Sequence, residues 1–226
     1  MKIRENFKKA ITDYLYLLER SFPQKSIIKL IGDRYLLSKV ERGILYRGIT
    51  TSANAEFRKT KSANEKQIKN KALHIDAYNV LITIGSYLNG NTVFISTDGI
   101  LRDASEIHGK VFRSQLLEKS LILIFDYFKH LKTNEVHFYV DQPISNSGNL
   151  STHINSLIKE SGLKGLSETV NSPDYILKNN NIEICCTSDS AIIDNCSGEY
   201  FDLAYHTLVF HYNPDFIDFR DLVINS

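Results

Sequence analysis

The N-terminal part of the chain has the apolar spacing of helices. Between residues 3 and 20, apolar side chains recur every three or four positions, which predicts an amphipathic helix. Pro23 predicts the start of a second helix, which Gly32 ends. Ser38 and Glu41 have the spacing of a capping box and predict a third helix. We therefore expect a small helical unit at the N-terminus.

The next segment, residues 50–71, is polar and rich in lysine and arginine. Few of its side chains are suited to a core, so it is expected to form a basic linker or a surface arm.

From residue 72 onward, short apolar runs alternate with segments of helical spacing. The runs predict strands at 72–75, 92–95, 100–102, 136–140 and 182–186, with helices between them. Asp98 and Gly99 predict a hairpin turn. Such alternation is typical of an α/β fold with a mainly parallel sheet flanked by helices. The aromatic-rich stretch 201–226 is expected to be a packing flap or an interface. We expect three parts: a helical unit at 1–49, a basic linker or arm at 50–71, and an α/β domain at 72–226.

Charge is distributed unevenly along the chain, although the net charge is only +1. Residues 1–71 contain 17 Lys and Arg against 7 Asp and Glu, and residues 72–226 contain 10 against 19. A basic segment beside an acidic domain suits an enzyme that holds phosphates with one part and divalent cations with the other. The alternative is that the two segments contact each other or form solvated helix faces.

Composition excludes several classes of protein. Hydrophobic residues make up 42% of the 226 residues, as in ordinary packed domains. The sequence has no apolar run near the roughly 18 residues that span a bilayer. It also has no secretory signal, so a cytoplasmic protein is expected. Cys185, Cys186 and Cys196 are expected to be buried, reduced thiols. P-loop, GxGxxG and GxSxG motifs are absent from the sequence.

Three aspartates stand at or just beyond the ends of predicted strands: Asp76, Asp141 and Asp189. In an open parallel sheet, ligands bind at the carboxyl ends of the strands, so these carboxylates are expected to converge. Like charges that lie close together favour a bound cation or raised pKa values. Mg²⁺ or Mn²⁺ would suit carboxylate oxygens and could activate water beside a phosphoryl group. The alternative for Asp76 and Asp189 is a helix N-cap.

The segment His74-Ile75-Asp76-Ala77-Tyr78-Asn79-Val80 resembles the opening strand motif of NYN domains, a branch of the PIN-like nucleases. That motif is an apolar residue followed by Asp-x-x-Asn. Further resemblances are Phe138-Tyr139-Val140-Asp141, Ser172-Pro173-Asp174-Tyr175 and Thr187-Ser188-Asp189-Ser190. The resemblance implies a Rossmann-like three-layer PIN/NYN domain with metal-dependent nuclease activity.

The chain also resembles the archaeal and bacterial family called domain of unknown function 434, and this resemblance is expected to cover nearly all of the chain. The residues that carry it are Gly32 to Ser38, Arg42, Arg47, the Asp76 segment, Asp103 with His108-Gly109, Asp141 to Gly148, and Thr187 to Asp194. This second resemblance implies no activity.

Roles follow from the resemblance and from the strand ends. Asp76, Asp141 and Asp189 would bind the metal, Asp174 would be a fourth catalytic carboxylate, and Asp194 is a further candidate metal ligand. Asn79 would position a phosphate oxygen or hold Asp76, and Ser188 would act similarly near Asp189. His108 is a candidate general acid, with a surface or packing role as the alternative.

Substrate contacts are expected from two places. Ser147 lies where a helix begins, and free backbone N–H groups there could bind phosphate, with a hydroxyl N-cap as the alternative. Arg34, Arg42 and Arg47 are the candidate nucleic-acid surface of the helical unit. The resemblance favours RNA over DNA and is compatible with a homodimer, since PIN-like nucleases are often dimers.

The sequence therefore predicts a metal-dependent nuclease, with RNA as the favoured substrate, that hydrolyses phosphodiester bonds at an aspartate cluster with Mg²⁺ or Mn²⁺. The alternative is a non-catalytic nucleic-acid-binding or regulatory protein on a PIN-like scaffold.

Overall fold

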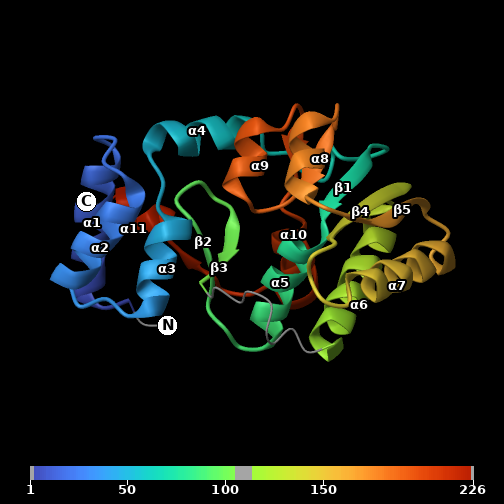
Figure 1. Ribbon diagram of the computed structural model, residues 1–226, viewed down its shortest axis with the longest axis horizontal. Coiled ribbons are helices and arrows are strands. Elements are labelled where there is room, and N and C mark those ends of the chain that lie inside the picture. Colours follow the sequence, from blue (N-terminus) through green and yellow to red (C-terminus); the bar gives the residue numbers. More distant parts are fainter. Residues whose placement is uncertain (1–2, 105–113, 225–226) are drawn as a thin grey trace. The chain divides into compact units, whose positions relative to one another are not determined.

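The computed structural model describes residues 3–104 and 114–224 (Figure 1). The chain divides into two compact units that are interleaved in the sequence. The helical unit consists of Met1–Thr60, Ser86–Glu106 and Asp215–Ser226, and the sheet unit of Lys61–Gly85 and Ile107–Pro214. This division differs from the contiguous one expected from the sequence, because short strands from the middle and the end of the chain group with the N-terminal helices.

Four helices open the helical unit: α1 (Glu5–Leu18), α2 (Gln24–Arg34), α3 (Lys39–Gly48) and α4 (Ser52–Thr60). The capping box predicted for α3 is confirmed. The backbone N–H of Glu41 donates to Ser38 Oγ at 3.3 Å, and that of Ser38 donates to Glu41 Oε2 at 2.8 Å. The predicted linker differs from the structure, since α4 occupies residues 52–60 and Arg58 is buried.

A three-stranded sheet completes the helical unit, with the order β3 (Leu101–Asp103), β2 (Val93–Ile95) and β8 (Ile217–Asp218). The predicted hairpin is confirmed: β2 and β3 are antiparallel, and Gly99 takes a φ of 84° at the turn, which suits glycine. The short helix α11 (Arg220–Ile224) follows β8. Phe94 and Phe219 pack in the same hydrophobic core as Phe7 of α1, so these strands are part of the helical unit's core.

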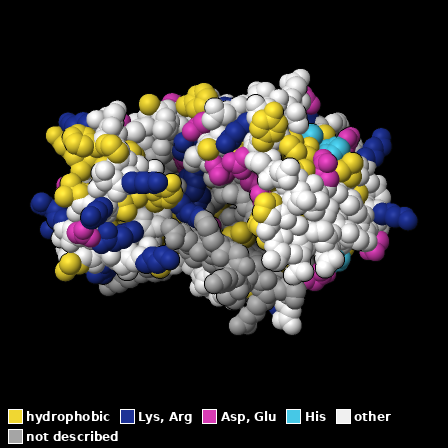
Figure 2. All heavy atoms as spheres, viewed as in Figure 1, with side chains coloured by type: hydrophobic (Ala, Val, Ile, Leu, Met, Phe, Trp, Pro, Cys, Tyr) yellow, Lys and Arg dark blue, Asp and Glu magenta, His cyan; other side chains and the backbone are white. Residues whose placement is uncertain are grey.

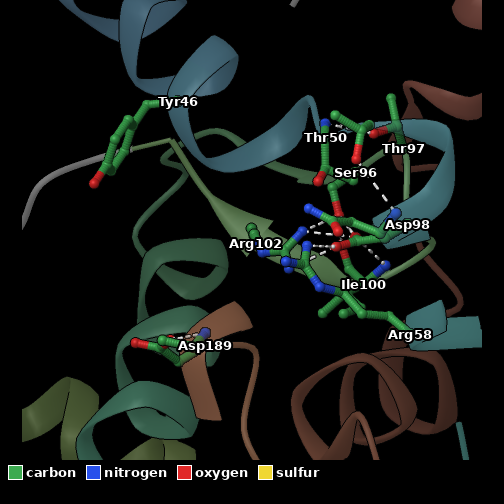
Figure 3. Close-up of polar contacts among 12 residues, drawn as sticks. Tyr46, Thr50, Arg58, Ser96, Thr97, Asp98, Ile100, Arg102 and Asp189 are labelled. Carbon is green, nitrogen blue, oxygen red and sulfur yellow. Dashed lines mark hydrogen bonds and ion pairs between the residues drawn. The ribbon is translucent and has the colours of Figure 1, made fainter. Parts of the chain in front are cut away.

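A buried ion cluster lies in this unit around Asp98, whose side chain is fully enclosed (Figure 3). Asp98 Oδ2 accepts from Arg58 Nη1 at 2.8 Å and from Arg102 Nη2 at 2.9 Å. Asp98 Oδ1 accepts from Arg102 Nη1 at 2.7 Å, and the Ser96 hydroxyl donates to the same oxygen. Burial alone would raise the pKa of Asp98, but the charge and hydrogen bonds of Arg102, with those of Ser96 and Arg58, lower it to about 2.

The sheet unit contains a five-stranded, fully parallel sheet, as the alternation of elements predicted. Its order is β5 (Lys164–Val170), β4 (Glu135–Asp141), β1 (Ala72–Asp76), β6 (Ile184–Cys186) and β7 (Glu199–Tyr200). The segment expected to be an arm continues this sheet: the Ala63 N–H donates to the Tyr200 carbonyl, and the Tyr200 N–H donates to the Lys61 carbonyl, both at 2.8 Å.

Helices cover both faces of the parallel sheet (Figure 1). On one face, Phe125 of α6 (Ser114–Leu131) stacks on Phe138 of β4. The helices α7 (Ser147–Glu160) and α10 (Leu203–Tyr212) lie on this side, and α8 (Pro173–Asn179) and α9 (Ser190–Asn195) lie on the other. The helix α5 (Ala77–Leu88) follows β1 directly. None of the helices within the described ranges combines the length and apolar character that a bilayer crossing demands.

Candidate functional site

The ends of β1 and β6 form the point where the sheet connections change direction. From β1 the chain builds β4 and then β5 on one side, and it returns to place β6 and β7 on the other. Ligands bind at such switch points in open parallel sheets, at the carboxyl ends of the strands. Asp76 is the last residue of β1, and Thr187, Ser188 and Asp189 follow β6 directly. The fold therefore places the predicted aspartates on either side of the switch point.

Asp76 is buried at the centre of this group. Its Oδ2 accepts a hydrogen bond from Thr187 Oγ1 at 3.1 Å, and its Oδ1 lies 3.5 Å from the backbone nitrogen of Asn79. Burial raises the pKa of Asp76 from 3.8 to about 7, and the negative charges of Asp141, Asp174 and Asp189 add to this effect. The hydrogen bond from Thr187 opposes the shift. Burial thus outweighs the hydrogen bond from Thr187, and among the described residues no positive charge offsets it.

The other carboxylates come from three different elements. Asp141 ends β4, the strand beside β1, and its pKa is raised by burial and by the charge of Asp174. Asp174 lies in the first turn of α8 and pairs with Lys178 Nζ at 3.2 Å. Asp189 is the N-cap of α9, as considered from the sequence, because its Oδ1 accepts from the Ala191 N–H at 2.6 Å. Figure 2 shows acidic side chains gathered on the surface beside α8 and α9.

The carboxylates act on one another by charge but are not arranged as a finished set of ligands. Within residues 3–104 and 114–224, no three His, Cys, Asp or Glu side chains are grouped so that they could hold a metal ion. Asp194, the further candidate ligand, lies in α9 and is half-buried. Direct binding of a cation by three of these side chains would therefore require some of them to rotate.

Asn79 connects the two sides of the switch point. Its Oδ1 accepts from the backbone N–H of Ser188 at 2.7 Å and from the Ser188 hydroxyl at 2.9 Å. Thr187 Oγ1 completes the link, because it donates to Asp76 and accepts from the Asp189 N–H at 3.1 Å. The Asn79 side chain thus holds the loop after β6, while its backbone N–H contacts Asp76. Thr187 was part of the Thr-Ser-Asp motif but had no predicted role of its own.

The Asn79 contact leads to a prediction about stability. Replacing Asn79 with alanine leaves both the N–H and the hydroxyl of Ser188 without this acceptor, and we expect a loss of about 1–3 kcal/mol. Ser188→Ala keeps the backbone bond and should cost less, about 0.5–1.5 kcal/mol. Denaturant unfolding of the two variants measures both values. An equal cost for the two variants would show that the bond to the backbone N–H contributes nothing.

Ser147, predicted to bind phosphate, begins α7 and is buried. Its hydroxyl donates to the carbonyl of Gln142 at 3.1 Å, so the side chain is engaged within the chain. Asn146 occupies the N-cap position with a φ of 66°. The hydroxyl N-cap considered as the alternative for Ser147 is therefore wrong.

The three predicted arginines differ in their surroundings. Arg42 donates to Asp33 Oδ1 at 2.9 Å and to the Leu37 carbonyl at 3.2 Å. Arg47 donates to Asp103 Oδ2 at 2.8 Å, and that aspartate is buried. Arg34 is the most exposed of the three and lies 3.8 Å from an Asp13 carboxylate oxygen. Arg42 and Arg47 thus have structural partners. His108 lies outside the described residues.

Comparison with known proteins assigns the chain to a family without a known activity. Residues 6–61 match the family described as protein of unknown function (DUF434), which confirms the predicted resemblance for this segment only. Residues 65–206 match a different family, domain of unknown function (DUF5616), so the expectation that one family covers nearly all of the chain is wrong. The uncharacterized protein MJ0935 of Methanocaldococcus jannaschii is 30% identical over 195 residues, which cover 86% of this chain and 92% of the relative. No solved structure matches the chain. Its residues 65–206 make the chain a member of the DUF5616 family.

Proposed function

We propose that this protein is a metal-dependent ribonuclease that hydrolyses phosphodiester bonds at the switch point of a PIN/NYN-like sheet. The observation that carries the proposal is the environment of Asp76. A buried carboxyl whose pKa is raised to about 7, partly by three other carboxylates, is costly for a fold to keep unless the site has a use for the charge. Binding a divalent cation is the use that suits four carboxylates gathered near the carboxyl ends of parallel strands.

The donor atoms suit Mg²⁺ or Mn²⁺. Both ions prefer carboxylate oxygens, and Mg²⁺ usually keeps several waters and takes only one or two protein carboxylates directly. A finished set of three side-chain ligands is therefore not required. Asp76 and Asp141, on adjacent parallel strands, are the best placed for direct contact, while Asp174 and Asp189 could bind through water. When bound, the ion would help to activate water and to stabilise charge on the phosphoryl group.

The chain's own residues have distinct tasks in this proposal. Thr187 orients the Asp76 carboxylate through its hydroxyl, and Asn79 holds the loop that carries Asp189. Each of these contacts already limits the rotation of a side chain or a loop. Less conformational entropy is therefore lost when a cation and a phosphate bind. Asp194 stays a candidate ligand.

The choice of RNA rests on the NYN-like motif order alone, whereas basic side chains supply the candidate nucleic-acid surface. Figure 2 shows lysine and arginine side chains spread over the α1–α3 part of the helical unit. Such side chains would contact phosphates without reading the bases. Because Arg42 and Arg47 bind within the chain, Arg34 is the best candidate of the three for a direct phosphate contact.

A second candidate function is nucleic-acid binding without cleavage. The observation in its favour is that the described carboxylates are not grouped as metal ligands. On this reading, the PIN/NYN-like domain would keep its fold and its acidic edge but would not assemble a catalytic centre.

The experiment that decides between the two incubates the purified protein with labelled single-stranded RNA in Mn²⁺ or Mg²⁺, and then in EDTA. The proposal expects cleavage products in metal and none in EDTA. A gel-shift measurement on the same samples reports binding. Binding without cleavage in either metal would reject the nuclease and support the second candidate.

Asp76 also predicts how stability depends on pH in metal-free protein. Its folded-state pKa of about 7 lies above the ordinary 3.8, so the folded state keeps a proton that the unfolded chain releases. The contribution to stability is fully present below about pH 4 and is lost as the pH rises through about 7. One pKa unit corresponds to about 1.4 kcal/mol, so Asp76→Asn should be the more stable protein at pH 8, by up to a few kcal/mol.

Adding Mn²⁺ at pH 8 should reduce the stability advantage of Asp76→Asn over the wild type. A cation that binds only the folded state at 100 times its Kd stabilises by about 2.7 kcal/mol. We expect thermal unfolding to show a rise in Tm for the wild type and a smaller rise for Asp76→Asn. Equal rises in the two proteins would place the Mn²⁺ elsewhere.

A further inference from the structure

Two cysteines of the sheet unit lie close together beside the candidate site. Cys185 is in β6 and Cys196 follows the last residue of α9, and their Sγ atoms are 3.6 Å apart. Both thiols are free and buried. At the end of α9, Lys61 Nζ donates to the carbonyls of Ile193 at 2.6 Å and Cys196 at 2.7 Å. Cys186 is the next residue of β6, and since side chains alternate along a strand it points to the opposite face of the sheet.

We propose that Cys185 and Cys196 form a reversible disulfide that regulates the site at the switch point. The oxidant is a peroxide. One thiol loses its proton and attacks a peroxide oxygen, which gives a sulfenic acid and releases water from hydrogen peroxide. The second thiol then attacks that sulfur, the S–S bond forms, and a second water leaves. Two thiols are oxidised by two electrons in total, and one hydrogen peroxide is reduced to two waters. A dithiol reductant reverses the step by thiol–disulfide exchange.

The bridge would act on the segment that carries the site. The loop between the two cysteines contains Thr187, Ser188 and Asp189. A disulfide places its sulfurs about 2.0 Å apart, so the two sulfurs must approach by more than 1 Å. Cys185 is in a strand hydrogen-bonded on both sides, to β1 and to β7, so its backbone is the less free to move.

Most of the movement therefore falls on the end of α9. This helix has six residues and begins at the cap formed by Asp189, so a shift of the helix is passed to that carboxylate. A displacement of about 1 Å at a reactive site can lower a rate by on the order of 10²-fold. The oxidised protein is therefore the less active form. This regulatory half of the inference rests on the proposed nuclease function, whereas formation of the bridge does not.

The first experiment tests the bridge itself. The full-length protein is treated with hydrogen peroxide, denatured, alkylated and mapped by mass spectrometry. We expect a Cys185–Cys196 linkage that lacks two hydrogen atoms in the wild type and in Cys186→Ser, which is the matched control. Cys185→Ser and Cys196→Ser should show no linkage. Three alkylated thiols in the treated wild type, or a linkage through Cys186, would overturn the proposal.

The second experiment measures Mn²⁺-dependent RNA cleavage before and after peroxide. The wild type and Cys186→Ser should lose about tenfold or more of their rate and recover it in dithiothreitol. The double variant Cys185→Ser/Cys196→Ser should be insensitive to peroxide. A mapped bridge with an unchanged rate would overturn the regulatory half alone. Reduced protein that cleaves no RNA would reject the proposed function and the regulatory half with it, while the mass map would still decide whether the bridge forms.

Discussion

Replacing Asp76 by asparagine is expected to lower Mn²⁺-dependent RNA cleavage by at least about 10²-fold and to leave the protein folded. A metal ion contributes several kcal/mol to phosphoryl transfer, and each 1.36 kcal/mol is a factor of about ten in rate. Asparagine has nearly the same shape and can still accept from the Thr187 hydroxyl. It carries no charge, so it removes the negative oxygen at the centre of the carboxylate group. Cleavage rates at saturating RNA measure the effect.

A matched control separates the role of the site from a general loss of acidic charge. Asp126 is an exposed aspartate of α6 in the same unit, with 56% of its side chain accessible. Asp126→Asn should cleave RNA at the wild-type rate. Circular dichroism and thermal unfolding show whether both variants keep the fold. An Asp76→Asn protein that is folded and retains the wild-type rate would remove Asp76 from the site and leave the proposal without its main support.

Asp98→Asn is expected to lower the free energy of unfolding by about 3–5 kcal/mol, more than any other substitution proposed for this protein. The reason is that it removes one partner from a buried charge cluster. Arg58 and Arg102 both have 6% side-chain exposure, and the two guanidinium groups share this carboxylate. Without its charge, two buried cations remain close together. Urea unfolding at pH 7 measures the change in the free energy of unfolding.

The control for this prediction is an exposed ion pair of the same unit. Asp218 accepts from Arg220 Nε at 3.0 Å, and 51% of the Arg220 side chain is accessible. Asp218→Asn should cost only about 0–1 kcal/mol. A cost for Asp98→Asn no larger than that of the control would show that the buried cluster does not stabilise the unit.

The contribution of Asp98 to the free energy of unfolding also depends on pH. Because the folded-state pKa of Asp98 is about 2, this contribution is present above about pH 4 and is lost as the pH falls toward 2.

The sequence predicted elements well where one face of each element is buried. The helix α1 and the central strands β1, β4 and β6 have clear apolar patterns, and all were predicted near their observed positions. The strand β5 was not predicted, because it lies at the edge of the sheet and Ser167 is its one buried residue. The helix α10 was also missed, since its mixture of aromatic and β-branched residues hides the helical period and resembles an interface.

The candidate site was predictable only as far as the strand ends determine it. Asp76 and Asp141 end neighbouring parallel strands, so their sequence positions imply proximity. The contact between Asn79 and Ser188 joins residues 109 positions apart, and nothing in the local sequence indicates it. Asp98 is a second example. In the sequence a hairpin turn is enough to account for it, and its contact with Arg58, 40 positions away, is seen only in the structure. Long-range polar contacts depend on the packing of the whole unit, which apolar periodicity does not specify.

The chain passes between the helical unit and the sheet unit four times, so neither unit is one continuous stretch of sequence. A polypeptide of residues 6–61 alone would lack Phe94 and Phe219, which share a core with Phe7. Recombination between genes moves continuous pieces of DNA, and no single piece encodes either unit without part of the other. The segments matched at 6–61 and 65–206 are therefore expected to be inherited as one gene, because a crossover between them would produce two proteins with incomplete cores.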